Sequence, residues 1–270
     1  MSRVVALGSA DAFFSSARGN TAWLVEDGAP ACTVDLGPTA ILALRRLGRE
    51  PQEIGAVHFT HLHGDHIAGW PFLLVDAVYR AHREKPLFVT GPPGTRDRLR
   101  ALWAACYADA AAKELPFVLE VKELSPGDSA EVCGRRVEAL AAFHQRAPHV
   151  ALSLRLHGPA GVLAFTGDTG PHPGLSDLAR GAALLCSECT ELRIPASESA
   201  GASPDYPADA GRRHLAWDDL CAALPGLGVR RVALGHLGPD SRRAAAQIEA
   251  EARAAGLDLR VCDDLTAIEI

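Results

Sequence analysis

The feature that most constrains this chain is the segment Thr60 to His66, with the sequence Thr-His-Leu-His-Gly-Asp-His. It places four side chains that can bind a metal ion within six consecutive positions, directly after an apolar segment at 54–60 that is typical of a buried strand. Side chains two residues apart on an extended chain share a face, so His61 and His63 can bind one ion together. Asp65 and His66 come where the chain turns into a helix, and they point elsewhere. The segment therefore predicts a strand, a loop and a helix that carry ligands for two ions.

Composition describes an ordinary globular chain. Its 270 residues suit a single domain, 1–270, and an apolar fraction of 48% is ample for a large buried core. The net charge of −6 disfavours a surface that coats nucleic acid. These values exclude none of the common enzyme classes.

Cysteine usage and hydropathy indicate the compartment. The chain has seven cysteines, an odd number scattered through apolar surroundings, which favours reduced thiols over a disulfide framework. No apolar run is long enough to cross a bilayer, and no leader-like segment opens the chain. We therefore expect a cytoplasmic protein without a membrane partner.

Short strands with helices at intervals, and no linker-like change in composition, predict a two-layer β core with helices outside. The predicted strands lie at 4–7, 21–25, 31–34, 54–60, 87–90, 117–121, 131–132, 136–143, 151–156, 162–166, 182–186, 229–234, 257–261 and 266–270. The predicted helices lie at 39–47, 67–83, 96–115, 215–224 and 241–255. A polar, proline-containing loop at 196–209 is the expected mobile lid.

The His-x-His-x-Asp-His pattern of residues 61–66 resembles the signature of the metallo-β-lactamase superfamily. This resemblance implies an α/β fold over nearly the whole chain, the four-layer αβ/βα sandwich in which two mixed β-sheets pack face to face with helices outside. It also implies that Asp35, in Asp-Leu-Gly at 35–37, lies under the metal site and hydrogen-bonds around it. The alternative for Asp35 is a cap on the following helix.

Two ions need more ligands than residues 61–66 supply, and three residues near later strand ends fit: His144, Asp168 and His236. They match the superfamily's third histidine, its bridging aspartate in Gly-Asp-Thr, and its last histidine. His149 is the alternative to His144, which we favour because strand ends position ligands more reproducibly than loops. By resemblance, one ion is held by His61, His63 and His144, the other by Asp65, His66 and His236, with Asp168 and a hydroxide between them.

The predicted cofactors are accordingly two divalent metal ions, with zinc preferred and manganese or iron as alternatives. Two such ions, roughly 3.5–4 Å apart, make hydroxide available near neutral pH and neutralise charge that develops on the attacked centre. Asp65 is therefore counted among the catalytic residues as well as the ligands.

Residues 184–190, Leu-Leu-Cys-Ser-Glu-Cys-Thr, resemble the His-Glu-Ala-Thr segment of ribonuclease Z-like phosphodiesterases. Glu188 and Thr190 are retained, whereas Ser187 and Cys189 depart from it. His214 takes the place of that branch's His-Ser-Thr histidine, although Leu-Ala follows it here. The resemblance implies that Glu188 orients His214, which assists proton transfer at the leaving oxygen.

The interval between His144 and Asp168 is short, whereas ribonuclease Z proteins insert a tRNA-gripping arm there. We therefore predict a hydrolase that uses a dimetal-bridged hydroxide on small phosphodiester-type esters, cyclic or linear and nucleotide-like. The alternatives are an aryl or alkyl sulfatase or a lactonase of the same fold, ribonuclease Z, and a non-catalytic metal- or metabolite-binding protein. The expected partner is a small-molecule ester and not a nucleic acid, with a homodimer as the oligomeric option.

Overall fold

Successive side chains along the central strands pack against different layers of this fold. The structure is a computed structural model that describes residues 2–194 and 212–270. In β1 (Arg3–Gly8), Val4 and Ala6 pack into a core between two sheets, whereas Val5 and Leu7 pack against helices. Both faces of the strand are apolar because both are covered. The same division holds along other central strands, so the core consists of one inner and two outer layers.

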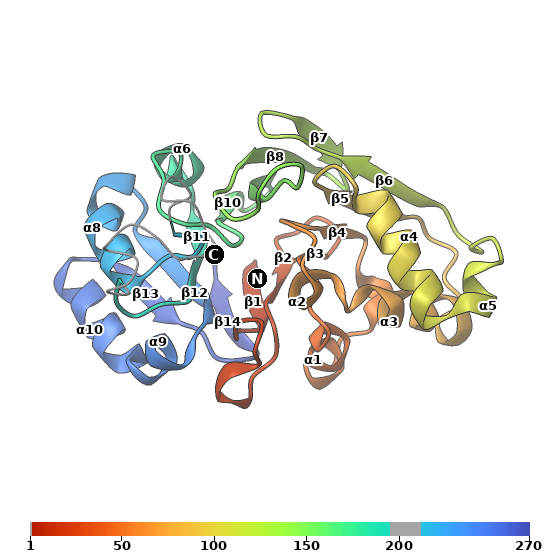
Figure 1. The fold of residues 1–270 in the computed structure, drawn as a ribbon, viewed down its shortest axis with the longest axis horizontal. Helices are drawn as coiled ribbons and strands as arrows, with labels where there is room; N and C mark the ends of the chain where they lie inside the picture. The colour runs from red at the N-terminus through yellow and green to blue at the C-terminus, as the bar shows by residue number, and fades with distance from the viewer. Residues whose placement is uncertain (1, 195–211) are drawn as a thin grey trace.

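The first sheet contains seven strands among the described residues, in the order β14-β1-β2-β3-β4-β5-β6. Besides β1, these strands are β14 (Thr266–Glu269), β2 (Ala22–Glu26), β3 (Cys32–Val34), β4 (Ala56–His58), β5 (Leu87–Gly91) and β6 (Leu119–Glu123). The α-helices on this side of the molecule are α1 (Ala40–Arg46), α2 (Gly64–Ile67), α3 (Trp70–Val75), α4 (Thr95–Cys106) and α5 (Ala108–Ala111) (Figure 1), with a π-helical turn at Asp76–Arg80 and short 3-10 helices at Ser15–Ala17 and Pro51–Glu53.

The second sheet also has seven strands in the described part of the chain, in the order β13-β12-β11-β10-β9-β8-β7. These strands are β13 (Asp258–Val261), β12 (Arg231–Leu237), β11 (Leu184–Cys189), β10 (Gly161–Phe165), β9 (Leu152–Gly158), β8 (Arg135–Ala141) and β7 (Ser129–Val132). The helices beside it are α6 (Leu175–Ala179), α8 (Trp217–Leu227), α9 (Pro239–Arg243) and α10 (Ala245–Ala254) (Figure 1). Because β10, β11 and β12 run parallel, their carboxyl ends meet at one edge.

The predicted fold class is confirmed: two mixed sheets face each other and helices lie outside them. Three predicted helices are divided in the structure: 67–83 into α2, α3 and a π-helical turn, 96–115 into α4 and α5, and 241–255 into α9 and α10. Pro71 lies in the first turn of α3, where its missing N–H costs no hydrogen bond, so it begins a new helix after Gly69.

The predicted lid at 196–209 lies outside the described residues, and the single-domain organisation stays a prediction. In the described ranges, no helix has both the length and the hydropathy to cross a membrane.

A buried histidine in β4 makes the stability of the fold sensitive to acid. His58 is fully buried, and its Nδ1 lies 2.9 Å from the Thr90 hydroxyl. Burial lowers the pKa of His58 to about 3, below the value of about 6.5 expected in an unfolded chain. The unfolded state therefore takes up this proton first as the pH falls. The stabilising contribution of neutral His58 is intact above pH 6.5 and is lost progressively from there towards pH 3.

We expect His58→Gln to remove this part of the acid sensitivity. The free energy of unfolding of the wild type should fall relative to that of the variant by about 1.4 kcal/mol per pH unit below pH 6.5. Urea unfolding of both proteins at pH 7.5, 6.5 and 5.5, in the same metal-containing buffer, measures the difference. Parallel pH profiles for the two proteins would contradict the assignment.

Candidate metal centre and its proton-transfer network

The predicted metal ligands meet at the edge where strands of both sheets end. Four come from the loop after β4 and from α2, and the others follow β8, follow β10 or lie in β12. Their ligand atoms form two adjoining groups, His61, His63 and His144 in one and Asp65, His66, Asp168 and His236 in the other.

The first group consists of three imidazoles whose nitrogens converge. Nδ1 of His63 lies 3.1 Å from Nε2 of His61 and 3.1 Å from Nε2 of His144. Tetrahedral zinc with Zn–N bonds of about 2.0–2.1 Å separates two ligand nitrogens by about 3.3 Å. His63 is exposed, so this group is open to solvent on one side, as a catalytic metal site requires.

The second group combines two imidazoles with two carboxylates. Nε2 of His66 lies 3.3 Å from an oxygen of Asp65 and 3.3 Å from Oδ1 of Asp168. Nε2 of His236 lies 3.4 Å from Asp65 and 3.2 Å from Oδ2 of Asp168. The same Oδ2 is 3.8 Å from Nε2 of both His61 and His144. Asp168 therefore lies between the two groups, which is the geometry of a bridging ligand.

Partners outside the two groups orient these rings. Nδ1 of His66 lies 2.8 Å from the Asp35 carboxylate, Nδ1 of His144 lies 3.0 Å from the carbonyl oxygen of Arg213, and Nδ1 of His236 lies 2.9 Å from the Thr190 hydroxyl. A carboxylate and a carbonyl can only accept, so Nδ1 of the first two rings carries a proton. The Nε2 lone pair of each neutral ring is then directed into the site, as in metal-binding histidines.

The buried polar atoms of the site fit divalent cations. Among the described residues, Nε2 of His66 and Oδ1 of Asp168 are buried and have no hydrogen-bond partner. Burial lowers the pKa of the first-group histidines, which keeps their imidazoles neutral. Although burial opposes it, Asp168 raises the pKa of both His66 and His236. The carboxylates of the second group thus stabilise positive charge, and neutral imidazoles with carboxylates form a donor set suited to zinc.

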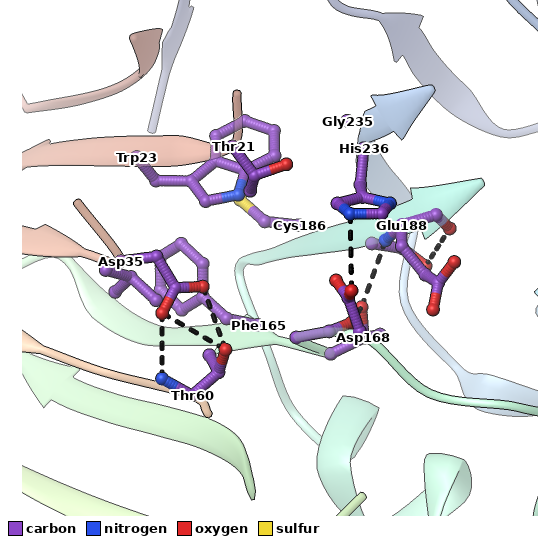
Figure 2. A pocket seen from close by; sticks show the side chains of 14 residues that line it. Thr21, Trp23, Asp35, Thr60, Phe165, Asp168, Cys186, Glu188, Gly235 and His236 are labelled. Carbon is purple, nitrogen blue, oxygen red and sulfur yellow. Dashed lines mark hydrogen bonds and ion pairs between the residues drawn. The ribbon is translucent and has the colours of Figure 1, made fainter. Parts of the chain in front are cut away.

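Asp35 lies beneath the site, as the resemblance implied. Its carboxylate accepts hydrogen bonds of 2.8 Å from the backbone N–H and the hydroxyl of Thr60 (Figure 2), and its Oδ2 also lies 2.8 Å from Nδ1 of His66. The helix α1 has Thr39 as its N-cap, so Asp35 does not cap it. The φ angle of Asp35 is 59°, in the left-handed region that a non-glycine residue occupies at a cost of about 1 kcal/mol or more.

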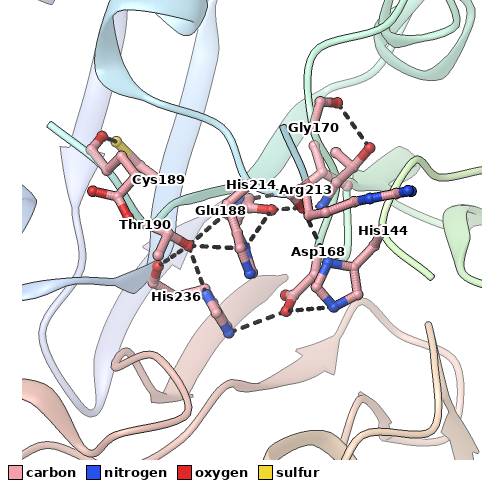
Figure 3. A network of polar contacts seen from close by, with 12 residues as sticks. His144, Asp168, Gly170, Glu188, Cys189, Thr190, Arg213, His214 and His236 are labelled. Atoms are coloured by element: carbon pink, nitrogen blue, oxygen red, sulfur yellow. Dashed lines mark hydrogen bonds and ion pairs between the residues drawn. The ribbon is translucent and has the colours of Figure 1, made fainter. Parts of the chain in front are cut away.

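A second set of polar contacts lies beside the metal groups (Figure 3). Nδ1 of His214 lies 3.0 Å from the Glu188 carboxylate, and its ring stacks on His236 with centroids 5.3 Å apart. Thr190 donates a hydrogen bond of 2.6 Å to Glu188 while its oxygen faces Nδ1 of His236. Burial opposes protonation of His214, but the Glu188 carboxylate outweighs it and raises the pKa of His214 to about 10. Glu188 and His214 are therefore brought together beside the second metal group.

The structure places His144 in the first group, whereas His149 is exposed. Two residues contribute to the site in ways that the sequence did not predict. Thr190, which is retained with Glu188 but had no predicted role, connects His236 to Glu188. Arg213 orients His144 through its carbonyl oxygen, and a backbone contact of this kind leaves no trace in the identity of the residue.

Comparisons with known proteins identify the family and agree with the fold. Residues 2–195 match the model of a family described as anti-Pycsar protein Apyc1. Ribonuclease Z of Methanothermobacter thermautotrophicus is 27% identical over an alignment of 316 residues that covers 100% of this chain and 97% of that protein. The metallo-β-lactamase fold protein YhfI of Bacillus subtilis superposes with a TM-score of 0.75 at 16% identity, covering 99% and 98% of the two chains. A diphosphatase from the PhnP family superposes with a TM-score of 0.73 at 14% identity, covering 100% and 98%.

The two loop histidines provide a test of the first group. We expect His144→Ala to lower the bound zinc from about two ions per chain to about one, because the first group loses a ligand. His149→Ala is the matched control and should retain both. Elemental analysis after dialysis at a buffered zinc concentration measures the content. Loss of metal from the His149 variant alone would transfer the assignment to that residue.

Proposed function

Because this chain belongs to the family described as anti-Pycsar protein Apyc1, within the metallo-β-lactamase superfamily, we propose that it is a metal-dependent hydrolase of small phosphodiesters. The substrate class is cyclic or linear and nucleotide-like. The observation that carries this proposal is the Glu188–His214 pair, which lies against the second of two adjoining ligand groups. Hydrolysis of a phosphodiester needs charge neutralisation at phosphorus and a proton at the leaving oxygen. Metal ions in the two ligand groups would supply the first, and the Glu188–His214 pair would supply the second.

We assign the ligands as the two groups divide them. One ion is held by His61, His63 and His144, the other by Asp65, His66 and His236, with Asp168 between them. Two zinc ions are the preferred occupants, and manganese or iron the alternatives. When bound, such ions supply Lewis acidity and lower the pKa of a coordinated water.

The chain's own residues would handle the proton and the orientation. Nδ1 of His214 is occupied by Glu188, which leaves Nε2 as the nitrogen that can donate a proton to the leaving oxygen. Thr190 fixes Glu188 on one side and His236 on the other, so the proton donor and the metal group share a common support. Asp35 orients His66 and thereby the second group.

Small substrates are favoured over tRNA by the connection after His144. From there to Asp168 the chain forms only β9, β10 and their short connections, with no protruding arm. The alignment with ribonuclease Z of Methanothermobacter thermautotrophicus is 316 positions long, whereas this chain has 270 residues. The relative therefore has segments without a counterpart here. The net charge of −6 also disfavours a polyanion. We therefore rank ribonuclease Z activity second, and we propose a cytoplasmic location in which small nucleotides are the partners.

A substrate panel tests the proposed reaction. We expect the zinc-loaded protein to hydrolyse bis(p-nitrophenyl) phosphate in preference to an aryl sulfate, a lactone and a β-lactam, and to lose this activity when the metal is chelated. Asp168→Ala should lower turnover by at least about 100-fold, because it removes the proposed bridging ligand. Preferential hydrolysis of the lactone or β-lactam would refute the assignment. If Asp168→Ala left every measured function unchanged, the result would favour the alternative of a non-catalytic metal- or metabolite-binding protein.

The role of His214 can be separated from metal binding by varying the leaving group. We expect His214→Ala to lower kcat by about 10²–10⁴-fold for a diester with an alkoxide leaving group, which needs a proton donor. The loss should be much smaller for p-nitrophenolate, which leaves without protonation. Zinc content serves as the control and should stay unchanged. Equal losses for both substrates would mean that His214 does not act as the acid.

A further inference from the structure

The Thr190 hydroxyl lies between the Glu188 carboxylate and the ring of His236 (Figure 3). Its Oγ1 is 2.6 Å from Oε2 of Glu188, 2.9 Å from Nδ1 of His236 and 3.1 Å from the carbonyl oxygen of His236. A hydroxyl has a single proton to donate and two lone pairs with which it can accept. The partner that takes this proton therefore decides which nitrogen of His236 is protonated.

Distance and charge direct the proton of Thr190 to Glu188. A contact of 2.6 Å is typical of a hydroxyl that donates to a carboxylate, and such a bond is about twice as strong as one between neutral groups. Glu188 is almost fully buried and also faces the backbone N–H of Thr169 at 2.5 Å and Nδ1 of His214 at 3.0 Å. Thr190 then accepts from Nδ1–H of His236, which leaves Nε2 of that ring unprotonated and able to bind a metal ion.

The same arrangement occurs at the first metal group. Oγ1 of Thr60 lies 2.8 Å from Oδ2 of Asp35 and 3.1 Å from Nδ1 of His61. The hydroxyl again donates to a buried carboxylate and accepts from a ring. Nε2 of His61 is thereby left to face His63, from whose Nδ1 it lies 3.1 Å. This second case is built from residues of the first sheet and its ligand loop, so it is a separate observation of the same device.

We propose that Thr60 and Thr190 are positioning residues that hold His61 and His236 in the tautomer that binds metal. Each can do so because a buried carboxylate takes the proton of its hydroxyl. The inference rests on the ligand assignment in the proposed function and deepens it, because it gives Glu188 a role in metal affinity besides its role in proton transfer. The carboxylate acts on a ligand that it does not itself contact.

Isosteric substitutions test the two hydroxyls by metal affinity. We expect Thr60→Val and Thr190→Val each to raise the dissociation constant of one of the two zinc ions by about 10- to 100-fold, because each removes the partner that orients a ligand. Serine at either position keeps the hydroxyl and should restore the constant to within about 3-fold of the wild type. Competition with a chromophoric zinc chelator measures both constants.

Thr33→Val is the matched control. Thr33 is fully buried in β3, and its hydroxyl has no hydrogen-bond partner among the described residues. The same substitution there should leave both zinc constants unchanged. Equal zinc affinity in wild type and in Thr60→Val and Thr190→Val would overturn the inference, as would serine variants that lose as much affinity as the valine variants.

A double-mutant cycle tests whether Glu188 acts through Thr190. Glu188→Gln should weaken the same zinc ion as Thr190→Val, although no hydrogen bond joins Glu188 to a proposed ligand in the described part of the chain. The factor for the double variant should fall at least about 3-fold below the product of the two single factors. Single factors that multiply in full would overturn the role assigned to Glu188.

These constants are measured without substrate, so they are independent of the proposed reaction. A wild type whose zinc affinity follows this pattern but that hydrolyses no diester would refute the proposed function alone. Unchanged zinc affinity in the threonine variants of an active enzyme would overturn this inference alone. If Thr190→Val did not fold, Glu188→Gln would decide the matter, because zinc affinity equal to that of the wild type would contradict the proposed connection.

Discussion

The carboxylate of Asp35 is the contact on which the geometry of the site depends. It is almost fully buried, and it joins Thr60 to His66 across the loop that carries four of the proposed ligands. The carbonyl oxygen of Thr60 in turn accepts a hydrogen bond of 2.8 Å from Leu152 N–H in the second sheet. Asp35, in a left-handed conformation, thereby fixes the position of the ligand-bearing loop of the first sheet relative to the second sheet.

Glycines that precede two of the ligands allow the second sheet to pack closely against the first. A Cβ on Gly235 would lie 2.7 Å from the indole of Trp23, so the strand that bears His236 can approach the first sheet only without a side chain there. A Cβ on Gly167, beside Asp168, would lie 2.8 Å from Thr60. The ligands from the second sheet are therefore placed by close packing against the first.

Much of this arrangement could be predicted from residue types, because dense histidines and strand-end aspartates are visible in a sequence. The fold class and the order of the ligands followed from that pattern and from resemblance. Other features could not be read this way. The division of 67–83 into α2, α3 and a π-helical turn depends on packing around Gly69 and on Pro71 together. Arg213 could not be found from its residue type, because it contributes through its own backbone carbonyl oxygen, which contacts His144, a residue distant in sequence.

The division of the ligands between the two sheets has a thermodynamic consequence. Four proposed ligands follow β4 of the first sheet, and His144, Asp168 and His236 belong to the second. A cation bound by both sets of ligands could bind only while the two sheets are packed together. Its binding free energy would therefore add to the free energy of unfolding of the chain. At a free concentration of 100 times its Kd, one such ion contributes about 2.7 kcal/mol. The centre would then join the two sheets of the sandwich, and the chain's resistance to unfolding would vary with the supply of metal.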